Sequence, residues 1–131
     1  GPIQSSVKTK TGEKEVPKSP GMKYRHYAPE TPVLIVEGTV ESFEKATQEA
    51  QKNGKIVGIM AQNVIVDAIE IGVEGTYKMG TSVDDMNRSL FDALRTLDHL
   101  GLDIILAQGA PETSVGIAYM NRLKKAASTV L

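Results

Sequence analysis

Short apolar runs separated by longer amphipathic stretches fill the chain from residue 32 onward. Runs at 33–36 and 56–60 are continuously apolar, and 102–107 is nearly so, each over the length of one strand. Such runs are typical of strands that are buried on both faces of a sheet. Residues 76–79 predict a further, shorter strand, so we expect four strands in this part of the chain.

The amphipathic stretches between these runs predict four helices, at about 42–52, 64–69, 82–100 and 114–128. The expected capping residues are Ser42, Ser82 and either Thr113 or Ser114. In three of the helices a stripe of apolar residues is expected to face the sheet: Phe43, Ala46 and Ala50; Met86, Leu90, Leu94 and Leu97; Ile117, Met120, Leu123 and Ala127.

Strands that alternate with helices predict an α/β fold with a mainly parallel sheet, because short parallel strands need helical crossovers. We expect a small Rossmann-like three-layer domain with about four to five strands. In such folds, ligands bind beyond the carboxyl ends of the strands. No Gly-x-Gly-x-x-Gly stretch follows a strand, and no Gly-Lys-Ser/Thr phosphate loop occurs, so the sequence lacks the common nucleotide fingerprints.

Composition narrows the class of protein further. The 131 residues are enough for one domain, and no apolar run approaches the roughly 20 residues that span a bilayer. The chain has no cysteine, which fits a cytoplasmic protein and excludes disulfides and thiolate metal sites. Only two histidines are present, so we expect no metal site. Gly1-Pro2 resembles the remnant of a cleaved expression tag.

Charge is distributed unevenly along the chain. Residues 1–29 have a net charge of +4, which leaves −5 for the rest. Part of the basic charge lies in residues 19–29, Ser-Pro-Gly-Met-Lys-Tyr-Arg-His-Tyr-Ala-Pro, which have no apolar periodicity and read as an extended connector. Its cationic and aromatic side chains suit an anionic or planar ligand. The alternative is a proline-rich linker that happens to be basic. We therefore divide the chain into an arm (1–18), a linker motif (19–31) and an α/β domain (32–131).

This motif resembles the interdomain linker of two-domain threonylcarbamoyl-AMP synthases. Residues 90–98 and 116–127 resemble the last two helices of the same family's C-terminal accessory domain. The resemblance implies a nucleotidyltransferase that makes threonylcarbamoyl-AMP from L-threonine, bicarbonate and ATP for tRNA modification. In that family the N-terminal domain, absent here, holds ATP with Mg²⁺ and threonine. The fragment alone is then expected to be inactive and to bind no cofactor.

The linker is expected to act as a lid on the catalytic domain. Five of its side chains are candidates for substrate or ATP binding: Lys23, Tyr24, Arg25, His26 and Tyr27. Asn121 and Arg122 are candidates for contacts with the catalytic domain, which is the expected partner, whereas direct binding of tRNA is not expected. No catalytic residue is assigned to this chain. Two alternatives stay open: a free-standing module that binds an anion at the loop 109–116, and a purely structural or dimerisation module.

Overall fold

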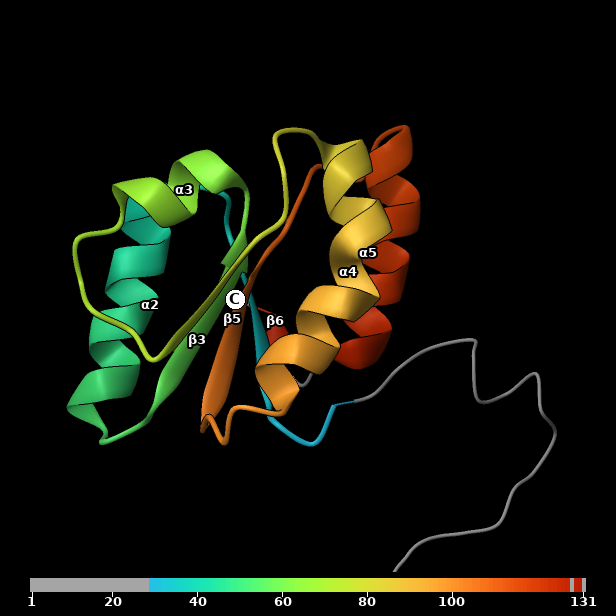
Figure 1. Ribbon diagram of the computed structural model, residues 1–131. Coiled ribbons are helices and arrows are strands. Elements are labelled where there is room, and N and C mark those ends of the chain that lie inside the picture. Colours follow the sequence, from blue (N-terminus) through green and yellow to red (C-terminus); the bar gives the residue numbers. More distant parts are fainter. Residues whose placement is uncertain (1–28, 128, 131) are drawn as a thin grey trace, which may run out of the picture.

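The computed structural model describes residues 29–127 and 129–130 (Figure 1). Strands and helices alternate along this part of the chain, in the order β2 (Val33–Val36), α2 (Val40–Lys52), β3 (Val57–Ala61), α3 (Asn63–Ala68), β4 (Gly75–Lys78), α4 (Val83–Asp98), β5 (Ile104–Gln108), α5 (Val115–Ala126) and β6 (Thr129–Val130). The four predicted strands and four predicted helices are all present. A short fifth strand, β6, is added at the end. None of the helices in the described ranges is long and apolar enough to cross a membrane.

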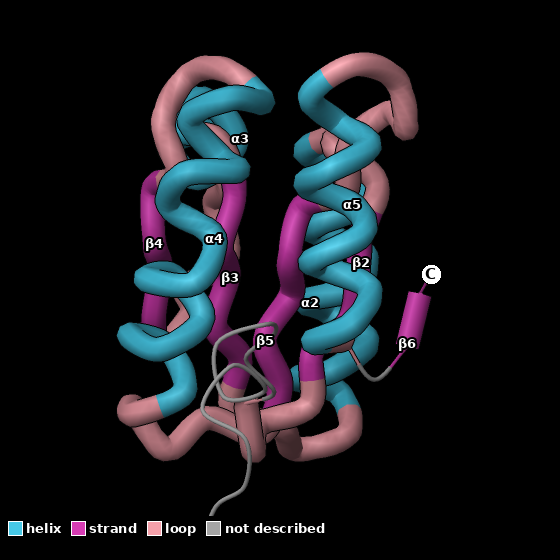
Figure 2. The backbone as a smooth tube through the Cα atoms, turned by 90° about the vertical axis from the view of Figure 1, so that its right-hand side faces the viewer, coloured by secondary structure: helices cyan, strands magenta, loops and turns pink. Residues whose placement is uncertain are grey.

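The strands form one parallel sheet in the order β4-β3-β5-β2-β6. Helices α2 and α3 cover one face, and α4 and α5 cover the other (Figures 1 and 2). The α/β class and the three layers are therefore confirmed. A Rossmann-like order would place the first two strands side by side. Instead, β5 lies between β2 and β3 and pairs with both.

Each face of the sheet has its own apolar core. The core under α4 and α5 contains the predicted stripe of α4, whose residues Met86, Leu90, Leu94 and Leu97 are fully buried. The core under α2 contains Phe43, Ala46 and Ala50 as predicted. Strands β3 and β5 contribute to both cores, because their alternate side chains point to opposite faces.

The helix ends differ in part from the sequence expectation. Ser82 caps α4 as predicted, in a capping box with Asp85. Helix α2 is capped by Thr39, three residues before the expected cap Ser42, and the Thr39 hydroxyl oxygen accepts from the Ser42 amide at 3.1 Å. Ser114 occupies the N-cap position of α5, but its side chain makes no capping hydrogen bond there.

Helix α5 turns three of its four predicted inward residues to the core. Leu123 is fully buried, Met120 is 6% exposed and Ala127 packs partly buried against the core, whereas Ile117 is 49% exposed. The prediction for Ile117 was wrong, and the fully buried Tyr119 was missed. The Tyr119 hydroxyl donates to the Gln108 carbonyl at 2.5 Å, which satisfies the polar end of a buried ring. Burial raises the pKa of the Tyr119 phenol well above its usual range.

Candidate functional site

All five side chains predicted to bind substrate lie outside the described residues. These are Lys23, Tyr24, Arg25, His26 and Tyr27. The two candidates for contacts with a partner domain lie on α5, where Asn121 and Arg122 are both exposed. The Arg122 guanidinium donates to Asn87 Oδ1 on α4 at 2.8 Å, so it also links the two helices on this face. Their contact with another domain stays a prediction.

The last residues of the linker motif are described together with Pro32, and we call residues 29–32 the linker base. Three of its hydrogen bonds converge on one carboxylate at the end of α4, and the Pro32 carbonyl accepts from the Ile105 amide at 2.9 Å. The Thr31 amide and the Thr31 hydroxyl both donate to Asp98 Oδ1, at 3.0 and 2.7 Å, and the Glu30 amide donates to Asp98 Oδ2 at 3.4 Å. Thr31 is 8% exposed. The linker base is therefore held against α4, a helix 67 positions away along the chain.

The surroundings of the linker base are rich in acidic side chains. A depression of about 670 Å³ lies at the amino end of the sheet, beside the base. Its lining includes Glu30, Asp98, Asp103 and His99. Asp103 Oδ2 accepts from the Ile56 amide at 2.8 Å, so a second carboxylate fixes backbone at this edge. Sequence reasoning missed both roles, because hydrogen bonds between distant segments leave no local pattern.

A second depression lies at the opposite edge of the sheet, beyond the carboxyl ends of β2, β3 and β5. We call this depression the crevice; it has a volume of about 550 Å³. It forms because β2 leads into α2 on one face, while its neighbour β5 leads into α5 on the other (Figure 1). The lining includes Glu37, Thr39, Gln62, Gln108 and Met120. The alternation of strands and helices predicts this edge as the general location of a ligand.

Two side-chain amides brace the crevice. Gln108 is 6% exposed, and its side-chain Oε1 accepts from the backbone amide of Gln62 at 2.8 Å. Gln108 Nε2 in turn donates to Gln62 Oε1 at 2.9 Å. Gly38 lies against the same group, since a Cβ there would come within 2.8 Å of Gln108 Nε2. The ends of β3 and β5 are thus tied together, and their polar groups are largely used within the protein.

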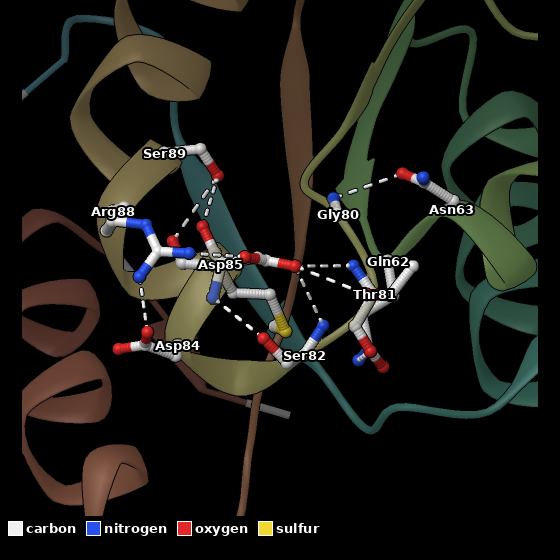
Figure 3. A network of polar contacts seen from close by, with 10 residues as sticks. Gln62, Asn63, Gly80, Thr81, Ser82, Asp84, Asp85, Arg88 and Ser89 are labelled. Carbon is white, nitrogen blue, oxygen red and sulfur yellow. Dashed lines mark hydrogen bonds and ion pairs between the residues drawn. The ribbon is translucent and has the colours of Figure 1, made fainter.

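A polar network continues from Gln62 into the loop between β4 and α4 (Figure 3). Gln62 Nε2 donates to the Thr81 carbonyl at 3.0 Å. Asp85 Oδ2 accepts from the Thr81 and Ser82 amides at 3.0 and 3.3 Å, and the Arg88 guanidinium pairs with Asp85 Oδ1 at 2.5 Å. The hydrogen bond from the Thr81 backbone amide is the main reason that the pKa of the Asp85 carboxyl is lowered. This carboxylate fills the anion cradle that the loop amides form.

The loop 109–116, the site of the anion-binding alternative, uses part of its backbone donors within the domain. The amides of Gly109, Ala110 and Gly116 already donate there. Among the described residues that line the crevice, Glu37 is the one carboxylate, and its charge disfavours an anion at that place. Across residues 29–127, no three His, Asp or Glu side chains gather in a way that could hold a metal ion.

Comparisons with known proteins agree with this fold. The family described as "Threonylcarbamoyl-AMP synthase, C-terminal domain" matches residues 2–128. A threonylcarbamoyl-AMP synthase of Pyrococcus abyssi is 42% identical over 83% of the chain and 32% of the relative, and one of Bacillus subtilis is 38% identical over 97% and 36%. The chain thus spans about a third of the length of these curated relatives.

A solved structure of Pyrococcus abyssi Sua5 in complex with L-threonine is similar to this chain as well. It is 33% identical, with a TM-score of 0.67, over 91% of this chain and 35% of that one. The resemblance noted in the linker motif and the last two helices is therefore confirmed over nearly the whole chain. The similar part is the smaller portion of each relative.

Proposed function

This chain belongs to the threonylcarbamoyl-AMP synthase C-terminal domain family, and from this we propose that it is the accessory domain and linker of such a synthase. The complete enzyme would condense L-threonine, bicarbonate and ATP into threonylcarbamoyl-AMP with release of pyrophosphate. That product would supply the modification of tRNA. ATP, threonine and Mg²⁺ would be held by an N-terminal catalytic domain, the partner of the domain described above.

One observation carries this proposal: the family match extends through the linker motif and includes residues 19–29. The chemistry of the described domain supports the same division of labour. Its buried polar groups Gln108 and Thr47 are hydrogen-bonded within the fold, and no set of metal ligands was found among residues 29–127. A domain of this kind is suited to supporting and positioning the linker. The reacting groups would come from the catalytic domain.

The linker would act as a lid over the catalytic cleft. Lys23 and Arg25 would stabilise phosphate or carboxylate charge, and Tyr24, His26 and Tyr27 would close the pocket. The product is a mixed anhydride that water can hydrolyse. A lid that excludes water would protect this anhydride and strengthen the electrostatic contacts inside the cleft.

The test is kinetic and uses the full-length enzyme. Arg25→Ala, His26→Ala and Tyr27→Ala should each lower the rate of threonine-dependent pyrophosphate release about 10- to 100-fold while the melting temperature stays within about 2 °C, because a misplaced positioning group costs rate and not stability. Lys14→Ala, which removes a cation from the arm outside the motif, is the matched control. Wild-type rates in all three motif variants would refute the lid.

The 131-residue chain alone provides a second test. Mixed with ATP, L-threonine, bicarbonate and Mg²⁺, it should release no pyrophosphate above the buffer control. Adding a separately produced catalytic domain should restore part of the activity. Pyrophosphate release by the fragment itself would show that a catalytic site had been assigned to the wrong domain.

A further inference from the structure

We propose that Thr31 and Asp98 form a linker anchor, a positioning pair that fixes the point at which the lid leaves the α/β domain. The inference rests on the proposed function, because it concerns how the lid is aimed. Neither residue is expected to touch substrate. Their effect would be to hold the linker base so that residues 23–27 approach the catalytic cleft from one place.

The geometry of the contact supports an anchoring role. One carboxylate accepts three hydrogen bonds from two successive residues of the linker base, two of them from Thr31. Hydrogen bonds to an ionised acceptor are shorter and stronger than neutral ones. The shortest here, from the Thr31 hydroxyl, measures 2.7 Å. The contact therefore holds the linker base against one carboxylate group.

The element that carries Asp98 is well suited to serve as a fixed point. Asp98 is the last residue of α4, and Leu94 and Leu97 in the preceding turn are fully buried in the core. Motion of Asp98 would require motion of this packed helix. The linker base is thus tied to one of the most firmly packed elements of the domain.

Asp98 is also an unfavourable choice for the helix itself. The last turn of a helix carries partial negative charge, so a carboxylate there is repelled while a cation such as Arg95 is favoured. The position gains nothing for α4 from a negative side chain. The three hydrogen bonds from residues 30 and 31 give the carboxylate a different task, which is to hold the linker base.

The effect of losing this anchor on lid closure can be worked out from the number of residues between the lid and its first fixed point. A fixed Thr31 limits the span back to position 27, four residues earlier, to about 14 Å. Without the anchor the first fixed point is Pro32, whose carbonyl accepts from the Ile105 amide at 2.9 Å, and the limit grows to about 17 Å. The volume open to the lid then rises about twofold, since volume scales with the cube of reach. Lid closure should become about twofold less frequent.

The first experiment measures the contact directly on this chain by amide hydrogen exchange. Asp98→Ala should speed exchange at the Thr31 amide about 10- to 100-fold, as expected for the loss of a hydrogen bond to a charged acceptor. Asp103→Ala is the matched control, because it removes a carboxylate that holds the Ile56 amide at the same edge. It should speed exchange at Ile56 and leave Thr31 unchanged. Unchanged exchange at Thr31 in Asp98→Ala would overturn the anchor.

The second experiment measures function in the full-length enzyme. Asp98→Ala, which removes all three hydrogen bonds, should lower kcat/KM for pyrophosphate release about twofold, and Thr31→Val, which removes the hydroxyl donor alone, should lower it by a measurable part of that. Thr31→Ser keeps the donor and should restore the wild-type value. Asp103→Ala should match wild type, although it also loses a backbone contact. If Asp98→Ala fails to fold, the comparison of Thr31→Val with Thr31→Ser still decides the matter.

The outcomes separate the anchor from the lid. If the Arg25, His26 and Tyr27 variants lose activity while Thr31→Val stays within the error of Asp103→Ala, the lid stands and the anchor is wrong. If those motif variants keep full activity, the lid fails, and a functional role for the anchor fails with it. Loss of activity in both groups, with rescue by Thr31→Ser, supports both proposals.

Discussion

Substitution of Gly116 by alanine should destabilise the domain, because the first turn of α5 has no room for a methyl group. A Cβ at Gly116 would lie 1.9 Å from the Pro111 carbonyl oxygen and 3.1 Å from its carbon. Real contacts of this kind are longer than 3.0 Å, so the loop or the helix would have to move by about 1 Å. The obstacle is backbone, which a change of side-chain rotamer cannot relieve.

The size of the effect follows from two opposing contributions. Overpacking a well-fitted site costs about 1–3 kcal/mol. Alanine is a better helix former than glycine by about 0.5–1 kcal/mol, which offsets part of this cost. We expect a net loss of about 1–2 kcal/mol in the free energy of unfolding. For a domain of this size, that loss lowers the melting temperature by about 4–16 °C.

The assay is thermal and urea unfolding followed by far-ultraviolet circular dichroism, since the chain has no tryptophan. Gly72→Ala is the matched control, because a Cβ at Gly72 would meet no atom within 4 Å. That change should leave stability unchanged or raise it by about 0.4–1 kcal/mol through the unfolded chain. A Gly116→Ala variant as stable as Gly72→Ala would refute the argument from close approach.

Two further predictions concern the core and the polar network. Leu94→Ala should lower the free energy of unfolding by about 2–5 kcal/mol in urea titrations, whereas Val64→Ala, at a site 69% exposed, should change it by less than about 0.5 kcal/mol. Because the pKa of Asp85 is lowered in the folded state, its stabilising effect is present above its ordinary pKa of 3.8 and is lost as pH falls below that value. The stability gap between wild type and Asp85→Asn should therefore shrink from pH 7 to pH 2 in urea titrations; a gap independent of pH would contradict the role of the amide cradle.

The sequence determined the elements whose signals are local. The stripe of Met86, Leu90, Leu94 and Leu97 identified α4 and its buried face, and Ser82 marked its N-terminal cap. The apolar runs 33–36 and 56–60 identified strands buried on both faces. These signals are read within one turn of helix or one strand, so neighbouring residues suffice. The linker motif was recognisable for the same reason.

The tertiary structure decided how these elements meet. The position of β5 between β2 and β3 depends on which apolar edges pair, and no local pattern records that choice. Tyr119 joins the inward face of α5 in place of Ile117, and the Gln108 carbonyl satisfies its hydroxyl. The contact of Thr31 with Asp98 joins residues 67 positions apart. Contacts of this kind arise only when the chain is packed, since their partners are chosen by the fold and not by sequence spacing.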